Sequence, residues 1–278
     1  MSEAVEGGPG RLERRPSRGA LAAMDLVQAL AGWRLWVSLG SNDIAQRYRR
    51  SKLGQFWITL SMAVFVITVG SIYAVLFGTS LGVQIPHVVV FFTVWAFMAQ
   101  SINEGATAFT DAERYLRQER LPKLSFVFRV IWRNLLAYVH NLVLVPLTFV
   151  LFAIPLTPVS VEALAGLAFL LVNSTLMVVI VAVLCTRFRD LRQVLTSLVQ
   201  MAFFASPVMW RMDILPEQSY WIVDLNPVAA HLRLIGEPLL GTPAPPHVLY
   251  MCAGTTAVLL AVALPLFVRF RERVVYWL

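Results

Sequence analysis

The sequence predicts an all-α integral membrane protein with six transmembrane helices. Of its 278 residues, 58% are hydrophobic and only 14% are charged, and the mean hydropathy is +0.69. A soluble domain usually has about a quarter of its residues charged, so this composition favours a membrane protein. Apolar runs recur along the chain, each near the ~20 residues that a helix needs to cross the hydrocarbon core. They lie at about 56–77, 86–110, 126–153, 163–185, 193–211 and 247–268.

The chain begins with a polar segment. Residues 1–22 are rich in Gly, Glu, Arg and Pro and contain no apolar core of a signal peptide, so we expect a disordered cytoplasmic tail. The rest, residues 23–278, is expected to form a single transmembrane domain.

An amphipathic helix is predicted at residues 25–39. Apolar residues recur there at spacings of four, three and four, which places them on one helical face: Leu26, Leu30, Trp33 and Val37. Asp25 is a suitable N-cap, and Gly40 a suitable end. Because the run is too short to cross a bilayer, we expect an interfacial helix along the inner leaflet. A soluble helix packed on a partner is the alternative.

The segment Arg47–Trp57, with the sequence RYRRSKLGQFW, marks the start of the first apolar run. Four cations within six residues precede two aromatic side chains. Such a block is typical of the boundary between water and lipid on the inner side of a membrane. Residues 41–54 are therefore predicted to form a cytoplasmic region between the interfacial helix and the first span.

The distribution of positive charge predicts the orientation. Nineteen of the 23 Arg and Lys residues fall in four segments that would all be inside: 1–55, 111–124, 186–192 and 269–278. Two others, Arg129 and Arg133, lie in the third span near its inner end, and the expected outer loops hold only Arg211 and Arg233. The positive-inside rule then places both termini in the cytoplasm. The net charge of +7 is explained by this orientation, and no nucleic-acid partner is expected.

The third outer connection, about 212–246, is long and contains apolar pieces too short to cross. Asn226 and Pro227 form an N-cap followed by a proline at the first helical position, so a short helix should begin there. Re-entrant helices at about 213–240 would line or close an outer pathway, because broken backbone in a membrane must face protein or an aqueous cavity. An amphipathic surface loop without a gating role is the alternative.

Motifs of enzymes and metal sites were not found. The sequence has no HExxH and no GxSxG motif, and Cys185 and Cys252 lack metal-ligand or disulfide spacing. Neither of the two lysines, Lys52 and Lys123, follows a glycine, which excludes a phosphate-binding GxxxxGK[ST] loop. Any ATP-driven transport would therefore need another polypeptide to bind the nucleotide.

The arginine-rich segment resembles a known family signature. Residues 47–57 are similar to the RYRRSxLGxFW motif of ABC-2 type permeases that export polysaccharide, a branch that includes O-antigen, capsule and teichoic-acid exporters. The segment Arg187–Leu191 resembles the RFRDL inner loop of this family, and Leu225-Asn226-Pro227 also agrees. The resemblance extends from about residue 25 to the end of the chain.

The resemblance implies a homodimeric channel in the bacterial cytoplasmic (inner) membrane. Two ABC nucleotide-binding ATPase subunits would bind ATP and Mg, while this chain would hold no cofactor. The substrate would be a lipid-linked glycan on undecaprenyl diphosphate. Residues 41–50 and the loop 111–123 would receive the ATP-driven motion.

Two other functions stay open. One is an ABC-2 permease for a small lipid or drug. The other is a membrane-embedded glycosyl or phosphoglycosyl transferase, for which Asp111, Glu113 and Glu119 are the only carboxylate group at an inner loop. Because these acids alternate with arginines, a solvated ion-paired face is the better interpretation.

Three sets of site residues follow from these expectations. Candidates for coupling or for recognition of the lipid diphosphate are Arg47, Tyr48, Arg49, Arg50 and Lys52; the alternative is topological anchoring with salt bridges to the ATPase. Candidates for lining a glycan channel are Phe56, Trp57, Tyr73, Trp95, Phe97, Glu104 and Trp210, although aromatic residues at span ends also form interfacial belts. Candidates for the outer gate are Asn226 and Pro227. No metal site is predicted.

Overall fold

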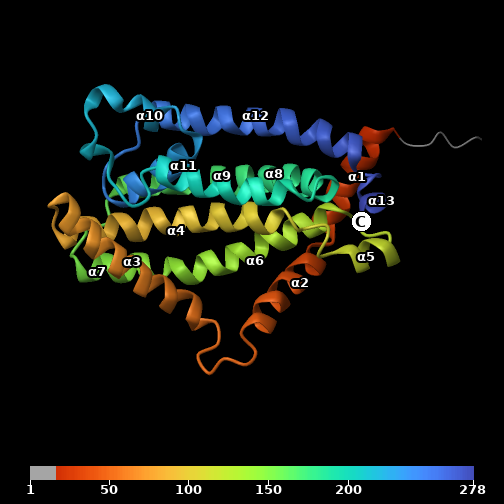
Figure 1. The fold of residues 1–278 in the computed structure, drawn as a ribbon, viewed down its shortest axis with the longest axis horizontal. Coiled ribbons are helices and arrows are strands. Elements are labelled where there is room, and N and C mark those ends of the chain that lie inside the picture. Colours follow the sequence, from red (N-terminus) through yellow and green to blue (C-terminus); the bar gives the residue numbers. More distant parts are fainter. Residues whose placement is uncertain (1–16) are drawn as a thin grey trace, which may run out of the picture.

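A computed structural model describes residues 17–278, so most of the predicted tail at 1–22 lies outside the described residues. This part of the chain is an elongated bundle of helices without strands (Figure 1). The α-helices are α1 (Arg18–Ala31), α2 (Trp33–Arg47), α3 (Phe56–Phe77), α4 (Leu81–Gly105), α5 (Glu113–Gln118), α6 (Leu124–Leu142), α7 (Leu144–Leu151), α8 (Ala163–Arg187), α9 (Leu191–Ala205), α10 (Trp221–Asp224), α11 (Pro227–Leu239), α12 (Pro246–Phe270) and α13 (Val274–Trp277).

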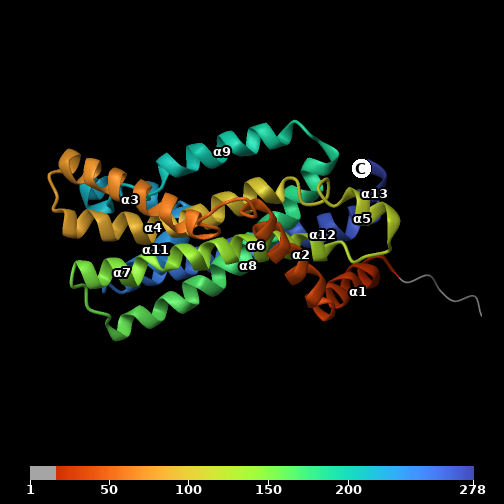
Figure 2. The same cartoon turned by 90° about the horizontal axis from the view of Figure 1, so that it is seen from below.

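The bundle has two distinct ends (Figures 1 and 2). Helices α1, α5 and α13 gather at one end, on the right in Figure 1, which we term the arginine-rich end. Helix α10 and the loop between α3 and α4 lie at the opposite end. Helices α2 and α3 diverge from the bundle as a V, and the turn at residues 48–55 forms its tip.

Five segments within residues 17–278 are long and apolar enough to cross a membrane. They are Phe56–Phe77, Leu81–Gly105, Leu124–Leu151, Pro158–Arg187 and Pro246–Phe270. The chain is therefore a multi-pass membrane protein, as the composition predicted. The span expected at 193–211 corresponds to α9, which has only 15 residues. At 1.5 Å per residue it is about 22 Å long, short of the ~30 Å hydrocarbon core, so the six-span count is not confirmed.

The single interfacial helix predicted at 25–39 is wrong in its bounds. The structure has two helices, α1 and α2, separated at Gly32, and α1 begins at Arg18 with Ser17 as its N-cap. The predicted tail therefore does not extend to residue 22. Asp25 is not an N-cap of its own helix, because it lies inside α1 and is fully buried.

Gly40 does not end a helix, contrary to the prediction, but lies in the middle of α2. A Cβ atom there would come 2.9 Å from Trp132 Cδ1 and 3.0 Å from the Arg129 carbonyl oxygen of α6. A glycine at this position allows α2 and α6 to approach closely. Residues 41–47, expected to belong to a separate coupling region, continue α2.

Helix α4 lies at the centre of the bundle and packs on α3, α6, α7, α8, α9 and α11. Its residues 84–97 are almost entirely buried and form one apolar core with residues of α8 and α11, among them Leu170 and Ile235. A second core near the arginine-rich end joins α6, α8 and α12 around Phe126, Val178 and Phe267. The predicted span 86–110 is thus shifted towards the N-terminus, and the predicted span 126–153 is divided into α6 and α7.

Helix α11 begins at Pro227 with Asn226 as its N-cap, as the sequence predicted. Its middle is buried between α4, α8 and α12. Two glycines allow this close packing: Gly166 of α8 lies against the Leu234 backbone, and Gly236 lies against the ring of Phe91. Inside the contact, Asn173 Nδ2 lies 2.7 Å from His231 Nε2.

Candidate functional site

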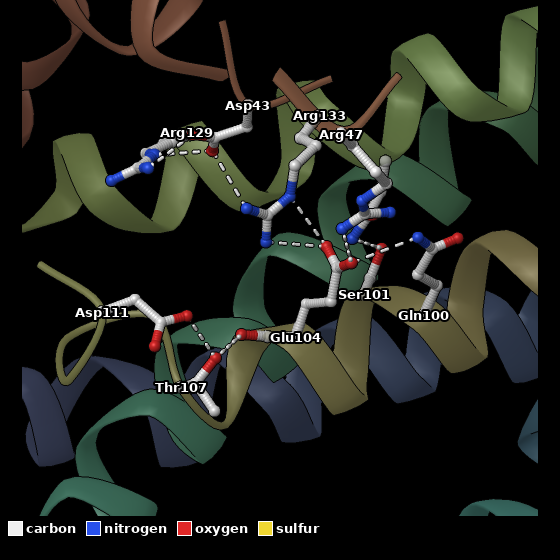
Figure 3. Close-up of polar contacts among 10 residues, drawn as sticks. Asp43, Arg47, Gln100, Ser101, Glu104, Thr107, Asp111, Arg129 and Arg133 are labelled. Atoms are coloured by element: carbon white, nitrogen blue, oxygen red, sulfur yellow. Dashed lines mark hydrogen bonds and ion pairs between the residues drawn. The ribbon is translucent and has the colours of Figure 1, made fainter. Parts of the chain in front are cut away.

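A network of ion pairs joins α2, α4 and α6 near the arginine-rich end (Figure 3). Asp43 of α2 receives two hydrogen bonds from Arg129, with Nη2–Oδ1 and Nε–Oδ2 distances of 2.6 and 2.8 Å. Arg133 bridges the network, because its Nη1 donates to Asp43 Oδ2 at 2.9 Å and its Nε donates to Glu104 Oε2 at 2.9 Å. Arg47 Nη2 donates to Glu104 Oε1 at 3.2 Å.

Helical spacing explains how the chain builds this network. Arg129 and Arg133 are one turn apart on α6, and Asp43 and Arg47 are one turn apart on α2, so each pair projects from one helical face. The close approach of α2 and α6 at Gly40 brings the two faces together. Three guanidinium groups and two carboxylates give the network one excess positive charge.

The side chains of the network are mostly removed from water. Those of Asp43, Glu104, Arg129 and Arg133 are between 13% and 19% exposed, whereas that of Arg47 is 48% exposed. Removing one partner of a buried ion pair leaves the other charge uncompensated, at a cost of about 3–5 kcal/mol. The network therefore links α2, α4 and α6 through charges that are costly to separate.

The candidates of the arginine segment divide into two groups. Arg47 is engaged with Glu104, and Tyr48 is partly buried beside a cavity of about 100 Å³ that Arg133 and Asn141 also line. Arg49, Arg50 and Lys52 are exposed and have no carboxylate partner within residues 17–278. A surface hollow of about 550 Å³ is lined by Gln46, Arg47, Arg49 and Arg50. This hollow presents unneutralised guanidinium groups to an anion.

The aromatic candidates occupy different environments. Phe56 and Trp57 are 77% and 44% exposed at the start of α3. Trp95 and Phe97 lie in the core, where Phe97 packs on Tyr138 of α6 with ring centroids 5.4 Å apart. Of these four, only Phe56 and Trp57 present their rings to the surface of the chain.

The other channel candidates are held by neighbouring groups. Tyr73 of α3 is partly buried and packs on Phe77. The indole of Trp210 donates to the carbonyl oxygen of Phe204 at 3.3 Å. The carboxylate of Glu104, in turn, is occupied by Arg47 and Arg133.

Asn226 connects two helices. Its Oδ1 accepts hydrogen bonds from the N–H groups of Val228 and Ala229, at 2.9 and 3.3 Å, and so caps α11. Its Nδ2 donates to Ser206 Oγ at 2.9 Å and to the Ala205 carbonyl oxygen at 3.2 Å, at the end of α9. One side chain therefore holds the end of a weakly packed helix against the start of a buried one. Pro227 occupies the first turn of α11.

A second buried cluster was not predicted from the sequence. The carboxylate of Asp25 accepts hydrogen bonds from the backbone N–H groups of Lys123 and Leu124, at 3.1 and 3.0 Å, and from Arg271 Nε at 2.8 Å. It thus caps α6 from another helix and ties α1 to the end of α12. Burial, together with the neighbouring Arg271, lowers the pKa of Lys123 below 10.5, and Asp25 partly opposes this effect.

Asp43, Arg129 and Arg133 were missed as site residues. A signal was present, since two arginines one turn apart in an apolar run need carboxylate partners. Among the described residues, no group of three His, Cys, Asp or Glu side chains could hold a metal ion, and Cys185 and Cys252 are buried free thiols. The arrangement binds helices together and offers a basic surface.

Comparison with known proteins identifies the family. The model of the ABC-2 type transporter family matches residues 34–235, which include the arginine segment, the ion-pair network and most of α11. The chain belongs to the ABC-2 type transporter family. The resemblance noted in the sequence is thus confirmed.

Two curated relatives of this family member are similar over most of their length. The O-antigen export system permease protein RfbA of Myxococcus xanthus is 29% identical over 221 residues, which are 74% of this chain and 80% of the relative. A protein of the same name from Klebsiella pneumoniae is 24% identical over 205 residues, which are 70% of this chain and 76% of the relative. Both are named as transport permeases rather than enzymes.

Proposed function

We propose that this protein is the membrane permease of an ATP-driven exporter that moves a lipid-linked polysaccharide of the O-antigen type across the bacterial cytoplasmic membrane. The observation that carries this proposal is the match to O-antigen export permeases from two genera over at least 70% of the chain. The exposed basic hollow at the arginine segment agrees with a substrate that carries a diphosphate. By the positive-inside rule, the arginine-rich end and both termini of this permease face the cytoplasm.

A homodimer is supported by the surface of α9. This helix lies entirely within the described residues, has no buried residue, and makes its main contacts with α4 and α8. One of its faces carries polar side chains, namely Gln193, Thr196, Ser197 and Gln200, all exposed. Val194, Leu198 and Met201 are exposed apolar residues of the same helix. A second copy facing this helix would cover the apolar side chains and enclose a path lined by the polar ones.

The ATPase subunit belongs at the arginine-rich end in this proposal. The chain has no phosphate-binding loop of its own, and α5 projects at that end with an exposed Glu113–Arg117 pair. Motion of the ATPase would displace α2, and the network at Asp43 and Glu104 would transmit it to the spans α6 and α4.

Recognition of the lipid diphosphate is assigned to Arg49 and Arg50. Both are exposed beside the hollow, and a guanidinium suits bidentate contact with phosphate. The competing role is docking of the ATPase. We expect the Arg49→Gln/Arg50→Gln variant to copurify with the ATPase and to lose stimulation of ATP hydrolysis by lipid-linked glycan. Arg34→Gln, which alters another exposed arginine of the α2 region, is the matched control. Loss of copurification would favour docking instead.

A deletion strain tests the overall function. We expect cells that lack this chain to accumulate lipid-linked glycan on the inner side of the membrane and to lose surface polysaccharide. A plasmid copy should restore export, whereas a copy carrying Glu104→Gln should restore it only in part. Normal surface polysaccharide together with sensitivity to a drug or a change in membrane lipid would favour a small-molecule permease. Loss of glycan synthesis itself would favour a transferase.

A further inference from the structure

A small cavity lies at the arginine-rich end, away from the ion-pair network. Its volume is about 220 Å³, and it is formed by the ends of α8 and α12 and by α13. Leu184 provides apolar surface above the buried Val183, Phe270 and Trp277 provide aromatic walls, and Arg187 and Arg273 provide positive charge. None of these residues belongs to the network around Glu104.

The fold-back of α13 creates this cavity. Val274 is fully buried in the core near the arginine-rich end, which seats α13 against α8. As a result Trp277 packs against Phe270, with ring centroids 5.5 Å apart. A Trp beside the end of a membrane-spanning helix is typical of the headgroup layer.

Both arginines are positioned by aromatic rings. The guanidinium carbon of Arg187 lies 5.6 Å from the ring centre of Trp277, and that of Arg273 lies 5.9 Å from the ring centre of Phe270. Within residues 17–278 neither guanidinium forms an ion pair. A cation–π contact occupies a face of the guanidinium plane and leaves its N–H edges able to donate to an anion.

The position of the cavity along the membrane-spanning helices indicates which ligand it can bind. Arg187 ends the candidate span Pro158–Arg187, and Phe270 ends the candidate span Pro246–Phe270. The arginines therefore lie where lipid phosphates lie, while Val183 and Leu184 lie one turn deeper, at the depth of acyl chains. Basic pockets between membrane helices at this level bind anionic lipid headgroups.

We propose that this cavity binds one anionic phospholipid of the surrounding membrane. The headgroup phosphate contacts Arg187 and Arg273, the two aromatic walls flank the glycerol region, and an acyl chain runs along Leu184. The lipid would fasten α13 to the ends of α8 and α12. This binding requires no transport and holds for any substrate of the permease.

Native mass spectrometry of the purified full-length chain tests the proposal. The chain is exchanged into detergent with equal mole fractions of phosphatidylglycerol and phosphatidylcholine, and the retained lipids are counted. We expect one phosphatidylglycerol per chain, retained at least tenfold over phosphatidylcholine. The Arg187→Gln/Arg273→Gln variant should lose this preference. Arg269→Gln, which removes a charge next to Phe270 but outside the cavity, should keep it.

Equal retention of the two lipids by the unaltered chain would overturn the proposal, as would unchanged retention of phosphatidylglycerol by the double variant. Loss of the phosphatidylglycerol in 10 mM inorganic phosphate would also overturn it, because the cavity would then be a site for free phosphate. Displacement by an equal mole fraction of undecaprenyl diphosphate would assign the cavity to the substrate carrier and also contradict it. The lipid comparison and both competitions use the unaltered chain, so they decide the matter even if the double variant does not fold.

Discussion

Arg47, the first residue of the arginine segment, donates a hydrogen bond to Glu104, 57 positions further along the chain in α4. The side chain of Glu104 is 19% exposed and also pairs with Arg133. The arginine segment is therefore not a free anchor at the membrane boundary. It begins at the edge of a network that extends through α6 to Asp43.

Replacement of Glu104 with glutamine should separate α4 from this network. The Glu104→Gln change would keep the shape of the side chain but leave Arg133 with one carboxylate partner, so we expect a loss of about 3 kcal/mol in the free energy of unfolding. Thermal unfolding in detergent, followed by tryptophan fluorescence, measures the change. Glu113→Gln breaks only the exposed pair with Arg117 and should change the stability by less than about 0.5 kcal/mol. Equal effects of the two changes would show that the network stabilises the protein no more than an exposed ion pair does.

The contact of Asp25 with Arg271 should be visible as an energetic coupling. Asp25→Asn leaves the partly buried guanidinium of Arg271 without its charge partner, and Arg271→Gln leaves a fully buried carboxylate with only backbone donors. A double-mutant cycle on thermal unfolding should give a coupling of about 1–3 kcal/mol. Lys52→Gln, at an exposed cation without a described partner, is the control and should not couple with Asp25→Asn. Additive effects of the Asp25 and Arg271 changes would contradict the clasp between α1 and α12.

Hydropathy predicted the long helices well because their apolar length is a local property. The predicted first span and α3 have the same bounds, whereas α9 stops early at Ala205, where Asn226 of a distant segment bonds its end. The bounds of α1 and α2 depend on tertiary contacts. Asp25 resembles an N-cap in the sequence, but its carboxylate oxygens accept hydrogen bonds from the N–H groups at the start of α6. Sequence spacing likewise did not reveal the ion-pair network, because Glu104 pairs with Arg47 across 57 positions and Asp43 pairs with Arg133 across 90 positions.

Asn226 should contribute to stability through both Oδ1 and Nδ2, and two variants separate the contributions of these atoms. Asn226→Ala removes the cap of α11 and the bonds to α9, with an expected loss of about 1–2 kcal/mol. Asn226→Asp keeps an acceptor for the Val228 and Ala229 N–H groups but loses the donor to Ser206. We therefore expect near-normal stability for Asn226→Asp, with faster hydrogen exchange at the end of α9. Hydrogen exchange unchanged in both variants would mean that Asn226 does not hold α9.

Close packing of α11 should make Gly236 intolerant of a methyl group. A Cβ atom there would overlap the ring of Phe91, so Gly236→Ala should destabilise the protein by about 1–3 kcal/mol. Gly254 of α12 has open space around its Cβ position, and Gly254→Ala should leave the unfolding temperature unchanged or slightly higher. If both alanines behave alike, α11 is not buried as tightly as the structure shows.

Transport by purified components tests the central claim most directly. This chain and its ATPase are reconstituted into vesicles with fluorescent glycan linked to undecaprenyl diphosphate, and movement across the bilayer is followed by protection from an added glycosidase. We predict ATP-dependent movement that needs both polypeptides and is slowed by Glu104→Gln. Movement without ATP, or equal rates in vesicles that lack this chain, would contradict a role as the permease of a polysaccharide exporter.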